Sequence, residues 1–130
     1  MDYKAFCSTI RQKFKEFVTV PTKFPNAPWK APADSKYCVL TILTGESMQK
    51  SIGVLEKFDR TPGVAIAQVF CPSGTGTQWS HDVAILIKAN FQQVTYDGVV
   101  FKTPTIRDIG FDNGLYQLNV NCPFYVDNVA

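Results

Sequence analysis

Four cysteines and one histidine are the first residues of this chain to consider as nucleophiles or zinc ligands. Cys7, Cys38, Cys71 and Cys122 are widely scattered, no two of them form a CxxC pair, and His81 is the only histidine. A zinc site needs clustered ligands, so this spacing does not favour one. Each cysteine also falls on the apolar side of an expected element, where a reduced thiol behaves as a small hydrophobic side chain. We therefore expect buried, reduced cysteines and no metal or cofactor.

The tripeptide Ser80-His81-Asp82 contains the residue types of a catalytic triad. On a helix, however, adjacent side chains point about 100° apart, so these three cannot converge on one another. The eleven acidic residues are dispersed along the chain and suggest no pair of catalytic carboxylates. We predict that the chain is not an enzyme.

The segment Gly74-Thr75-Gly76-Thr77 precedes an expected helix, and helix N-termini can bind phosphate. The third glycine of a dinucleotide fingerprint would fall at Trp79, and no Gly-Lys-Ser/Thr follows as in a P-loop. The segment is therefore interpreted as a strand-to-helix turn. A small hydrolase or nucleotide-binding enzyme is kept as a third alternative, which predicts an activity that is lost on mutating His81 or this turn.

The length and composition indicate one globular domain over residues 1–130. The chain is 45% hydrophobic and 18% charged, with a formal net charge of +2. This near-neutral charge does not predict a nucleic-acid or membrane binder, because either would carry a concentrated basic face. No stretch approaches the roughly 18 to 20 apolar residues of a membrane span, and the N-terminus does not resemble a secretory signal. We expect the chain to be made and kept in a cytoplasm.

The first expected element is an amphipathic helix that begins after Asp2, which can cap it, and ends before Pro21. Its apolar residues recur at three- and four-residue steps on one stripe: Tyr3, Phe6, Cys7, Ile10, Phe14, Phe17 and Val18. Its other side is basic: Lys4, Arg11, Lys13 and Lys15. Residues 20–34 hold four prolines and form an extended loop, with Phe24 and Trp29 expected to rest on the domain.

Strands are expected at 37–44 and 64–71, separated by a mixed segment at 46–58 and a turn at 59–63. A second helix is expected from about Gln78 to Phe91, with Thr77 as its cap. Its buried stripe is predicted to contain five large side chains: Trp79, Val83, Leu86, Ile87 and Phe91. Asp97-Gly98 predicts a hairpin between 94–96 and 99–101, and a further turn is expected at 112–114.

The last strand has the clearest pattern in the chain. Tyr116, Leu118, Val120, Cys122 and Phe124 alternate with the amides of Gln117, Asn119 and Asn121. Such alternation is typical of an antiparallel sheet with one covered face. The order helix, strands, helix, strands predicts an α+β domain, a mostly antiparallel sheet with two main helices packed on it. The amide row is interpreted as an exposed sheet face or, alternatively, as a subunit interface or lumen wall.

An ordered series of motifs resembles the tail terminator family of siphophages and related prophages. The series comprises Phe24-Pro25, Trp29 and a strand from Tyr37, then 63–70, Pro72-Ser73-Gly74-Thr75-Gly76, Phe91, 98–101, Pro104, Gly110, 114–120 and Pro123-Phe124. Each motif is a turn or a strand and has little specificity, so the weight lies in their order along nearly the whole chain.

The resemblance implies a tail-terminator-like fold that assembles into a ring, usually six-fold, at the head-proximal end of a virion tail. The implied partners are further copies of the chain, the tail tube protein, a neck or head-completion protein and the tape measure protein. Genome DNA would pass through the lumen without specific binding, and no membrane is involved. A cyclic ring closes through one heterologous interface after a fixed number of copies. The alternative is another ring-forming neck or head-completion protein, also assembled in the host cytoplasm.

No family motif marks the interfaces, so candidate contact residues come from the chain itself. The segment 46–60 is polar, interrupted by glycine and bounded by turns, which suits an arm that reaches a neighbour. Lys50, Lys57 and Arg60 are its candidates, beside the amide row. Charge reversal at Lys57 and Arg60 is expected to impair ring formation or tube capping.

Overall fold

A computed structural model describes residues 2–45, 48–49 and 58–129. Within these residues the helices and strands follow one another in this order: α1 (Tyr3–Phe17), β1 (Thr22–Lys23), β2 (Tyr37–Thr44), β3 (Met48–Gln49), β4 (Phe58–Pro72), α2 (Gln78–Phe91), β5 (Thr95–Tyr96), β6 (Val99–Phe101), β7 (Thr105–Asp112) and β8 (Leu115–Val129).

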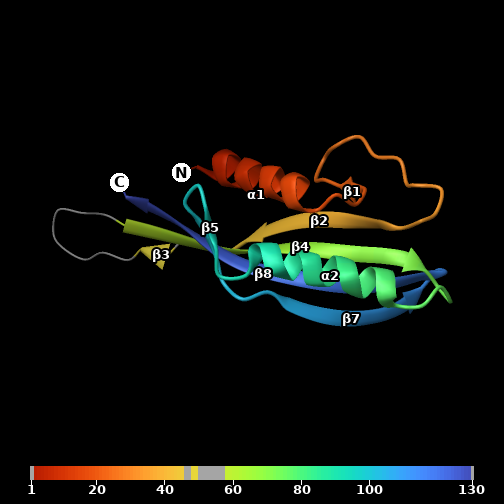
Figure 1. Ribbon diagram of the computed structural model, residues 1–130. Coiled ribbons are helices and arrows are strands. Elements are labelled where there is room, and N and C mark those ends of the chain that lie inside the picture. Colours follow the sequence, from red (N-terminus) through yellow and green to blue (C-terminus); the bar gives the residue numbers. More distant parts are fainter. Residues whose placement is uncertain (1, 46–47, 50–57, 130) are drawn as a thin grey trace.

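One sheet contains all the described strands, in the order β1-β2-β4-β8-β6-β5, with β3 beside β4 and β7 beside β8. Every described pairing is antiparallel except that of β1 with β2. The helices α1 and α2 both contribute to one hydrophobic core with the sheet (Figure 1). The predicted α+β class, with two helices on a mostly antiparallel sheet, is confirmed.

Helix α1 begins as predicted. The Asp2 carboxylate accepts a hydrogen bond from the Ala5 backbone N–H at 2.8 Å, which satisfies a donor that the first turn leaves unpaired. Phe6, Ile10 and Phe14 are buried, as the stripe predicts. Tyr3 is an exception, because 60% of it is exposed and its ring packs edge-on against Phe6.

Helix α2 differs from the prediction in its cap and in its buried stripe. The Thr77 side chain makes no capping hydrogen bond; instead its carbonyl oxygen accepts one from the Ser80 hydroxyl at 3.0 Å. Ser80 and Ala84 are buried together with three of the predicted residues, whereas Leu86 is 38% exposed. These small side chains allow the helix to approach the sheet closely, a feature that a search for large apolar residues misses.

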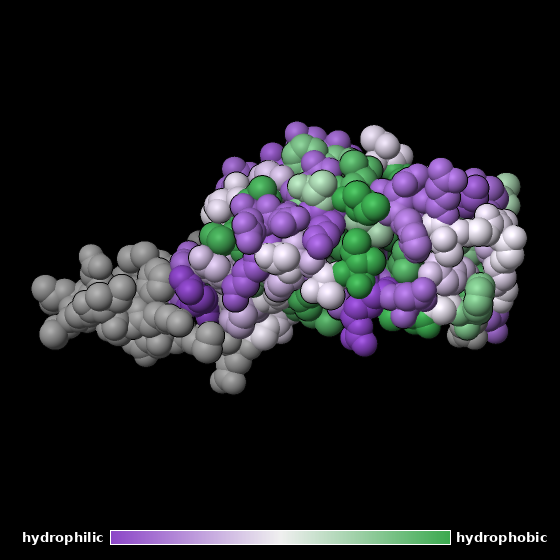
Figure 2. Space-filling view, turned by 60° about the horizontal axis from the view of Figure 1, so that its bottom comes forward, coloured by the Kyte–Doolittle hydropathy of each residue, from purple (hydrophilic) through white to green (hydrophobic). Residues whose placement is uncertain are grey.

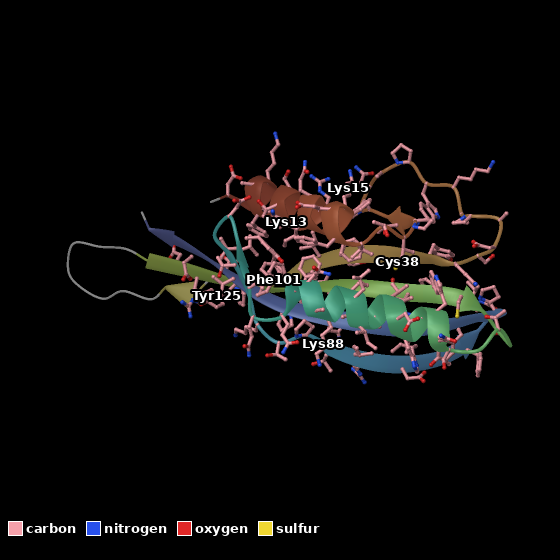
Figure 3. All side chains as sticks on the ribbon, viewed as in Figure 1. Lys13, Lys15, Cys38, Lys88, Phe101 and Tyr125 are labelled. Atoms are coloured by element: carbon pink, nitrogen blue, oxygen red, sulfur yellow. The ribbon has the colours of Figure 1, made fainter. Side chains whose placement is uncertain are left out.

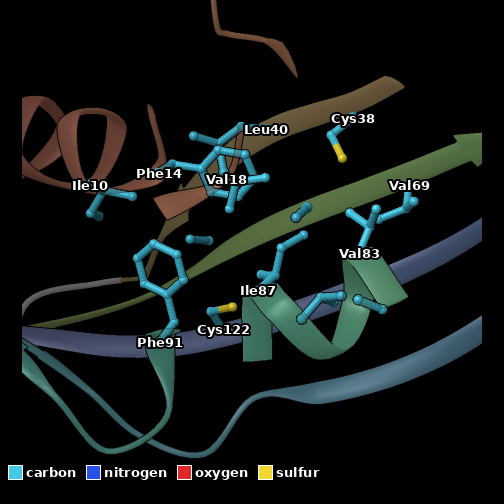
Figure 4. Close-up of a cluster of buried hydrophobic side chains, with 14 of the residues drawn as sticks. Ile10, Phe14, Val18, Cys38, Leu40, Val69, Val83, Ile87, Phe91 and Cys122 are labelled. Atoms are coloured by element: carbon cyan, nitrogen blue, oxygen red, sulfur yellow. The ribbon is translucent and has the colours of Figure 1, made fainter. Parts of the chain in front are cut away.

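The core lies between the two helices and the covered face of the sheet (Figure 4). Phe14 of α1 and Phe91 of α2 stack with ring centroids 6.0 Å apart, and the buried side chains of Leu40 and Cys122 line the same small cavity as these two rings. No helix in the described part of the chain combines the length and the apolar character that a membrane span requires.

The turn predicted at 59–63 is wrong. β4 runs straight through these residues and pairs with β8 over fifteen positions, from Phe58↔Val129 to Pro72↔Leu115. This long ladder outweighs the local turn preference of Pro62-Gly63. Gly63 does not form a turn but leaves room for the Phe124 ring, because a Cβ atom at Gly63 would lie 2.5 Å from that ring.

β7 is absent from the sequence prediction, because Asp108, Gly110 and Asp112 interrupt its alternation. The strand has a bulge between Asp108 and Gly110 where it pairs with β8, and Gly110 has a φ of +98°. A bulge of this kind accommodates glycine in a conformation that other residues avoid. The turn to β8 at Asn113-Gly114 and the hairpin at Asp97-Gly98 are both confirmed, each with two positive φ angles.

The proline-rich loop touches both faces of the sheet, as its aromatic residues predict. Phe24 packs edge-on against Phe14 on the helix side, with ring centroids 6.2 Å apart. The ring centroid of Trp29 lies 5.5 Å from that of Tyr37, and Tyr37 lies on the other face of the sheet. The loop is therefore held to the domain at both aromatic positions.

Candidate interaction surfaces

The sheet face opposite the helices, which we call the open face, is made of alternate residues of β2, β4 and β8. Register places twelve of them side by side in its centre: Tyr37, Val39, Thr41, Leu43, Val64, Ile66, Gln68, Phe70, Gln117, Asn119, Asn121 and Pro123. None of these twelve is charged, and all are half-buried except Leu43, which is exposed. A sheet face that is exposed to water normally carries charged side chains. The absence of charge from these twelve positions therefore makes the open face a candidate interaction surface.

The predicted amide row lies in the middle of the open face. Gln117 Nε2 donates to Asn119 Oδ1 at 2.7 Å, and Asn119 is in register with Gln68 on one side and Arg107 on the other. The Oδ1 atom of Asn121 is buried and accepts no hydrogen bond from the described residues. The structure thus brings the three predicted amides together on one uncovered surface.

Aromatic side chains form one end of the open face. Tyr37 stacks on Phe70 with ring centroids 5.1 Å apart, and Trp29 tilts against Tyr37. These rings shield one another from water, which holds the end of β2 against β4.

Beyond the helices, β4 and β8 continue as a ribbon, residues 58–62 with 125–129, which projects past the body together with β3 (Figure 1). Arg60 lies here, on the same face as the amide row but six positions along β8 from Asn121, or about 20 Å away. Its guanidinium donates to both oxygens of Asp127, at 2.8 and 3.0 Å, and its Cζ atom lies 3.9 Å from the centroid of the Tyr125 ring. Figure 3 labels Tyr125, which belongs to this ribbon. The hydrogen bonds to Asp127 raise the pKa of Arg60.

This geometry changes the meaning of the Arg60 prediction. A bidentate pair of opposite charges stacked on a ring stabilises the ribbon within one chain. Charge reversal at Arg60 would therefore break the ribbon itself, so its effect on assembly would not identify a contact with another copy. Lys50 and Lys57 lie outside the described residues.

The described side chains that could bind a metal ion or act as nucleophiles do not form a common site. Within the described part of the chain, no three His, Cys, Asp or Glu side chains form a group that could hold a metal ion. The four cysteines are unpaired; Cys38, Cys71 and Cys122 are buried and Cys7 is half-buried. Burial raises the pKa of Cys38 and of Cys122 to about 12, so neither is a thiolate at neutral pH. His81 is exposed, whereas Ser80 beside it is buried.

The turn before α2 has the backbone that its glycines allow. Gly74 and Gly76 have φ angles of +81° and +83°, with nothing within 4 Å of a Cβ built on either. They border a hollow that also includes Thr77, Phe111 and Tyr116. Tyr116 donates a hydrogen bond to Asp108 at 2.5 Å, which raises the pKa of the tyrosine to about 12.

Comparison with known proteins defines the fold alone. No family model and no curated protein matches the chain. Ten chains of solved structures do match. One of these superposes with a TM-score of 0.74 at 14% sequence identity, over 97% of this chain and 96% of that chain. Such low identity shows a shared architecture over the whole domain and carries no information about activity.

Proposed function

We propose that this chain is a structural protein of a phage virion, a tail terminator that forms a six-membered ring on the head-proximal end of the tail tube. The ring stops further polymerisation of the tube and offers its other side to a neck protein. The ordered sequence resemblance to the terminator family supports this proposal. The observation that carries it is the uncharged centre of the open face, formed by twelve residues of β2, β4 and β8.

The open face is suited to the wall of a channel through which DNA passes. Cations on such a wall would bind phosphates and release counterions, which would hold the passing duplex. Carboxylates would repel it. Amide and apolar side chains do neither, so a lumen lined by Gln68, Asn119 and Asn121 would let the genome slide. Cations lie at both margins of this face, where Arg107 of β7 is in register with Asn119 and Lys23 of β1 is in register with Val39.

The same argument assigns a place to each layer. If the sheet of each copy faces the channel, then α1 and α2 form the outside of the ring. The core between the layers keeps each copy rigid, and the ribbon with its Arg60–Asp127 pair projects from the end of the sheet. The open face and the helix layer would thus have separate roles, one for passage and one for folding.

A capping assay tests the proposal. Tail tube protein is polymerised with and without the purified chain, and tube lengths and end shapes are measured by negative-stain microscopy. A terminator shortens the length distribution and leaves density at one end of each tube. A neck or head-completion protein, the alternative, attaches only after a terminator or a head is added. Absence of binding under both conditions contradicts both functions.

A further inference from the structure

Large exposed hydrophobic side chains gather at two opposite edges of the sheet. Among the described residues the exposed ones are Tyr3, Leu43, Ile85, Leu86, Ile106, Ile109 and Phe111. Most belong to α2 and β7, at one edge; Tyr3 and Leu43 belong to α1 and β2, at the other. Concentration at two places, rather than even scatter, is typical of contact surfaces.

The edge formed by α2 and β7, called the α2/β7 edge, carries five of these seven exposed side chains. Ile85 is 60% exposed and lines a hollow of about 200 Å³ together with His81, Ala84 and Ile106. Phe111, 72% exposed, borders the neighbouring hollow beside Tyr116, of about 220 Å³. Figure 2 brings this side of the molecule forward and shows hydrophobic side chains in a band across its middle.

The opposite edge, called the α1/β2 edge, has a hollow of its own. Its volume is about 310 Å³, and it is lined by Tyr3, Lys4, Cys7, Arg11, Pro25 and Ile42. Tyr3 is 60% exposed there, and Leu43 next to Ile42 is 52% exposed. Apolar side chains and two cations therefore meet at this edge.

The two edges differ in charge in a complementary way. Two cations, Lys4 and Arg11, line the hollow of the α1/β2 edge. Among the described residues, no lysine or arginine lines either hollow of the α2/β7 edge, and the elements that form this edge carry the carboxylates of Asp82 and Asp108. Complementary potentials of this kind steer association and fix orientation. The same charges disfavour a contact between two α1/β2 edges or between two α2/β7 edges.

Both edges also end the described sheet. β7 pairs with β8 alone, and β2 beyond Val39 pairs only with β4 among the described strands. Such edges invite contact with another chain. The bulge at Asp108 and the charges of Arg107 and Asp108 disfavour long strand pairing at β7, so a contact at this edge depends mainly on side chains.

We infer that the occupant of the α2/β7 edge is the α1/β2 edge of a second copy of this chain. This inference rests on the proposed function and specifies which surfaces close the ring. Two different edges that fit each other make a heterologous contact, and such contacts repeat from copy to copy until they close. Neighbouring sheets then meet edge to edge, which turns every open face to the same side of the assembly.

Cross-linking tests this assignment with a cysteine that the chain already has. Cys7 lies in the α1/β2 hollow and is the one cysteine that is not buried. The variant Ile85→Cys places a second reactive thiol in the α2/β7 hollow. A short bis-maleimide is expected to join Cys7 of one copy to the new cysteine of the next, giving a ladder of covalent multimers. In the double variant Cys7→Ser with Ile85→Cys, the ladder should disappear.

The outcomes separate the contact from the function. Covalent dimers that persist in the double variant would show that like edges meet, which overturns the inference. If the protein forms rings on tubes but neither Ile85→Cys nor Ile106→Cys gives a cross-linked ladder, the inferred contact between edges is wrong and the proposed function stands. Absence of rings and of capping defeats both. As a second measurement, Ile85→Lys should reduce ring formation at least about tenfold, or about 1.4 kcal/mol, whereas Gln92→Lys, exposed at the end of α2, should leave it unchanged.

Discussion

The two faces of the sheet share the same strands and differ in almost everything else. On the covered face, alternate residues of β4 and β8 are apolar and buried under α1 and α2. On the open face, the central twelve residues are amides, aliphatic side chains, one threonine and two aromatic rings, and none is charged. The apolar composition of the covered face follows from folding, because these residues form the core. Folding does not explain the composition of the open face, because a face in contact with water alone would favour charged side chains.

This contrast separates stability from assembly. Substitutions on the covered face should destabilise the fold, whereas substitutions on the open face should leave the fold intact and, under the proposed function, change how the ring acts. Variants of the two faces, and of the places where they meet, therefore test whether the faces differ in this way.

The largest effect is expected from Phe14→Ala. Phe14 is 2% exposed and touches Phe91 and Phe24, so its removal leaves a cavity and should cost about 3–5 kcal/mol of unfolding free energy. The matched substitution on the open face is Phe70→Ala, which should cost about 2 kcal/mol or less because its ring is only half-buried. Urea denaturation measures both, and equal losses would remove the distinction between the faces.

The next effect is expected at Gly63, where the body of the sheet joins the ribbon. Gly63→Ala places a methyl group against Phe124 and the Leu43 carbonyl oxygen, so Phe124 must move within the core. The expected loss is about 1–3 kcal/mol. Gly45→Ala is the control, since its methyl group would meet Pro62 Cγ at 3.3 Å. A Gly63 variant as stable as the Gly45 variant would contradict the close approach of Phe124.

Tyr116→Phe removes the hydrogen bond that ties β8 to the bulge of β7. The expected loss is about 0.5–1.5 kcal/mol at neutral pH. The folded pKa of Tyr116, about 12, exceeds the ordinary value of 10.0, so folding favours the neutral phenol. This contribution is complete below pH 10 and disappears as the pH rises from 10 to 12. Denaturation at pH 8 and pH 11.5 should therefore show a smaller difference between variant and parent at the higher pH.

A smaller effect, of opposite sign, is expected at Asn121. Its buried Oδ1 has no partner among the described residues, so Asn121→Val removes a desolvated polar atom and adds a residue that favours strands. Stability should stay equal or rise by up to about 1 kcal/mol. Thermal unfolding measures the change. A clear loss of stability would show that the amide oxygen has a partner in the folded chain.

The smallest effect on folding is expected from Gln68→Lys in the centre of the open face. Its unfolding free energy should change by about 0.5 kcal/mol or less. Rings should still form and cap tubes, because the edges are untouched, but the new cation should slow DNA passage and reduce infectivity in complementation tests. Gln68→Glu is the matched control of opposite charge. Loss of ring formation with both variants would assign the open face to an interface between copies.

The sequence alone predicts the covered face well and the edges poorly. The alternation of β8 and the stripe of α1 are consequences of burial, so both are confirmed in the structure. The Pro62-Gly63 turn is wrong because local preference cannot reveal a partner strand as long as β8. β7 escapes prediction because its bulge breaks the alternation that identifies a strand.

The candidate surfaces divide in the same way. The amide row can be predicted because alternation places three polar residues on one face. Arg60 stands out in the sequence for its charge. Its pairing with Asp127 cannot be predicted, because the two residues are 67 positions apart in the chain and meet only through the register of β4 with β8. The exposed residues of the α2/β7 edge give no signal in the sequence, because Leu86 and Ile106 look like core residues until the sheet shows where its edges lie.

A three-dimensional reconstruction of the chain bound to tail tubes would locate both sheet faces and both edges in one measurement. We expect a closed ring in which α1 and α2 lie outside, the α2/β7 edge of each copy meets the α1/β2 edge of the next, and the amide row faces the channel. A ring with helices lining the channel, or a preparation in which no ring forms on any tube, would contradict this expectation.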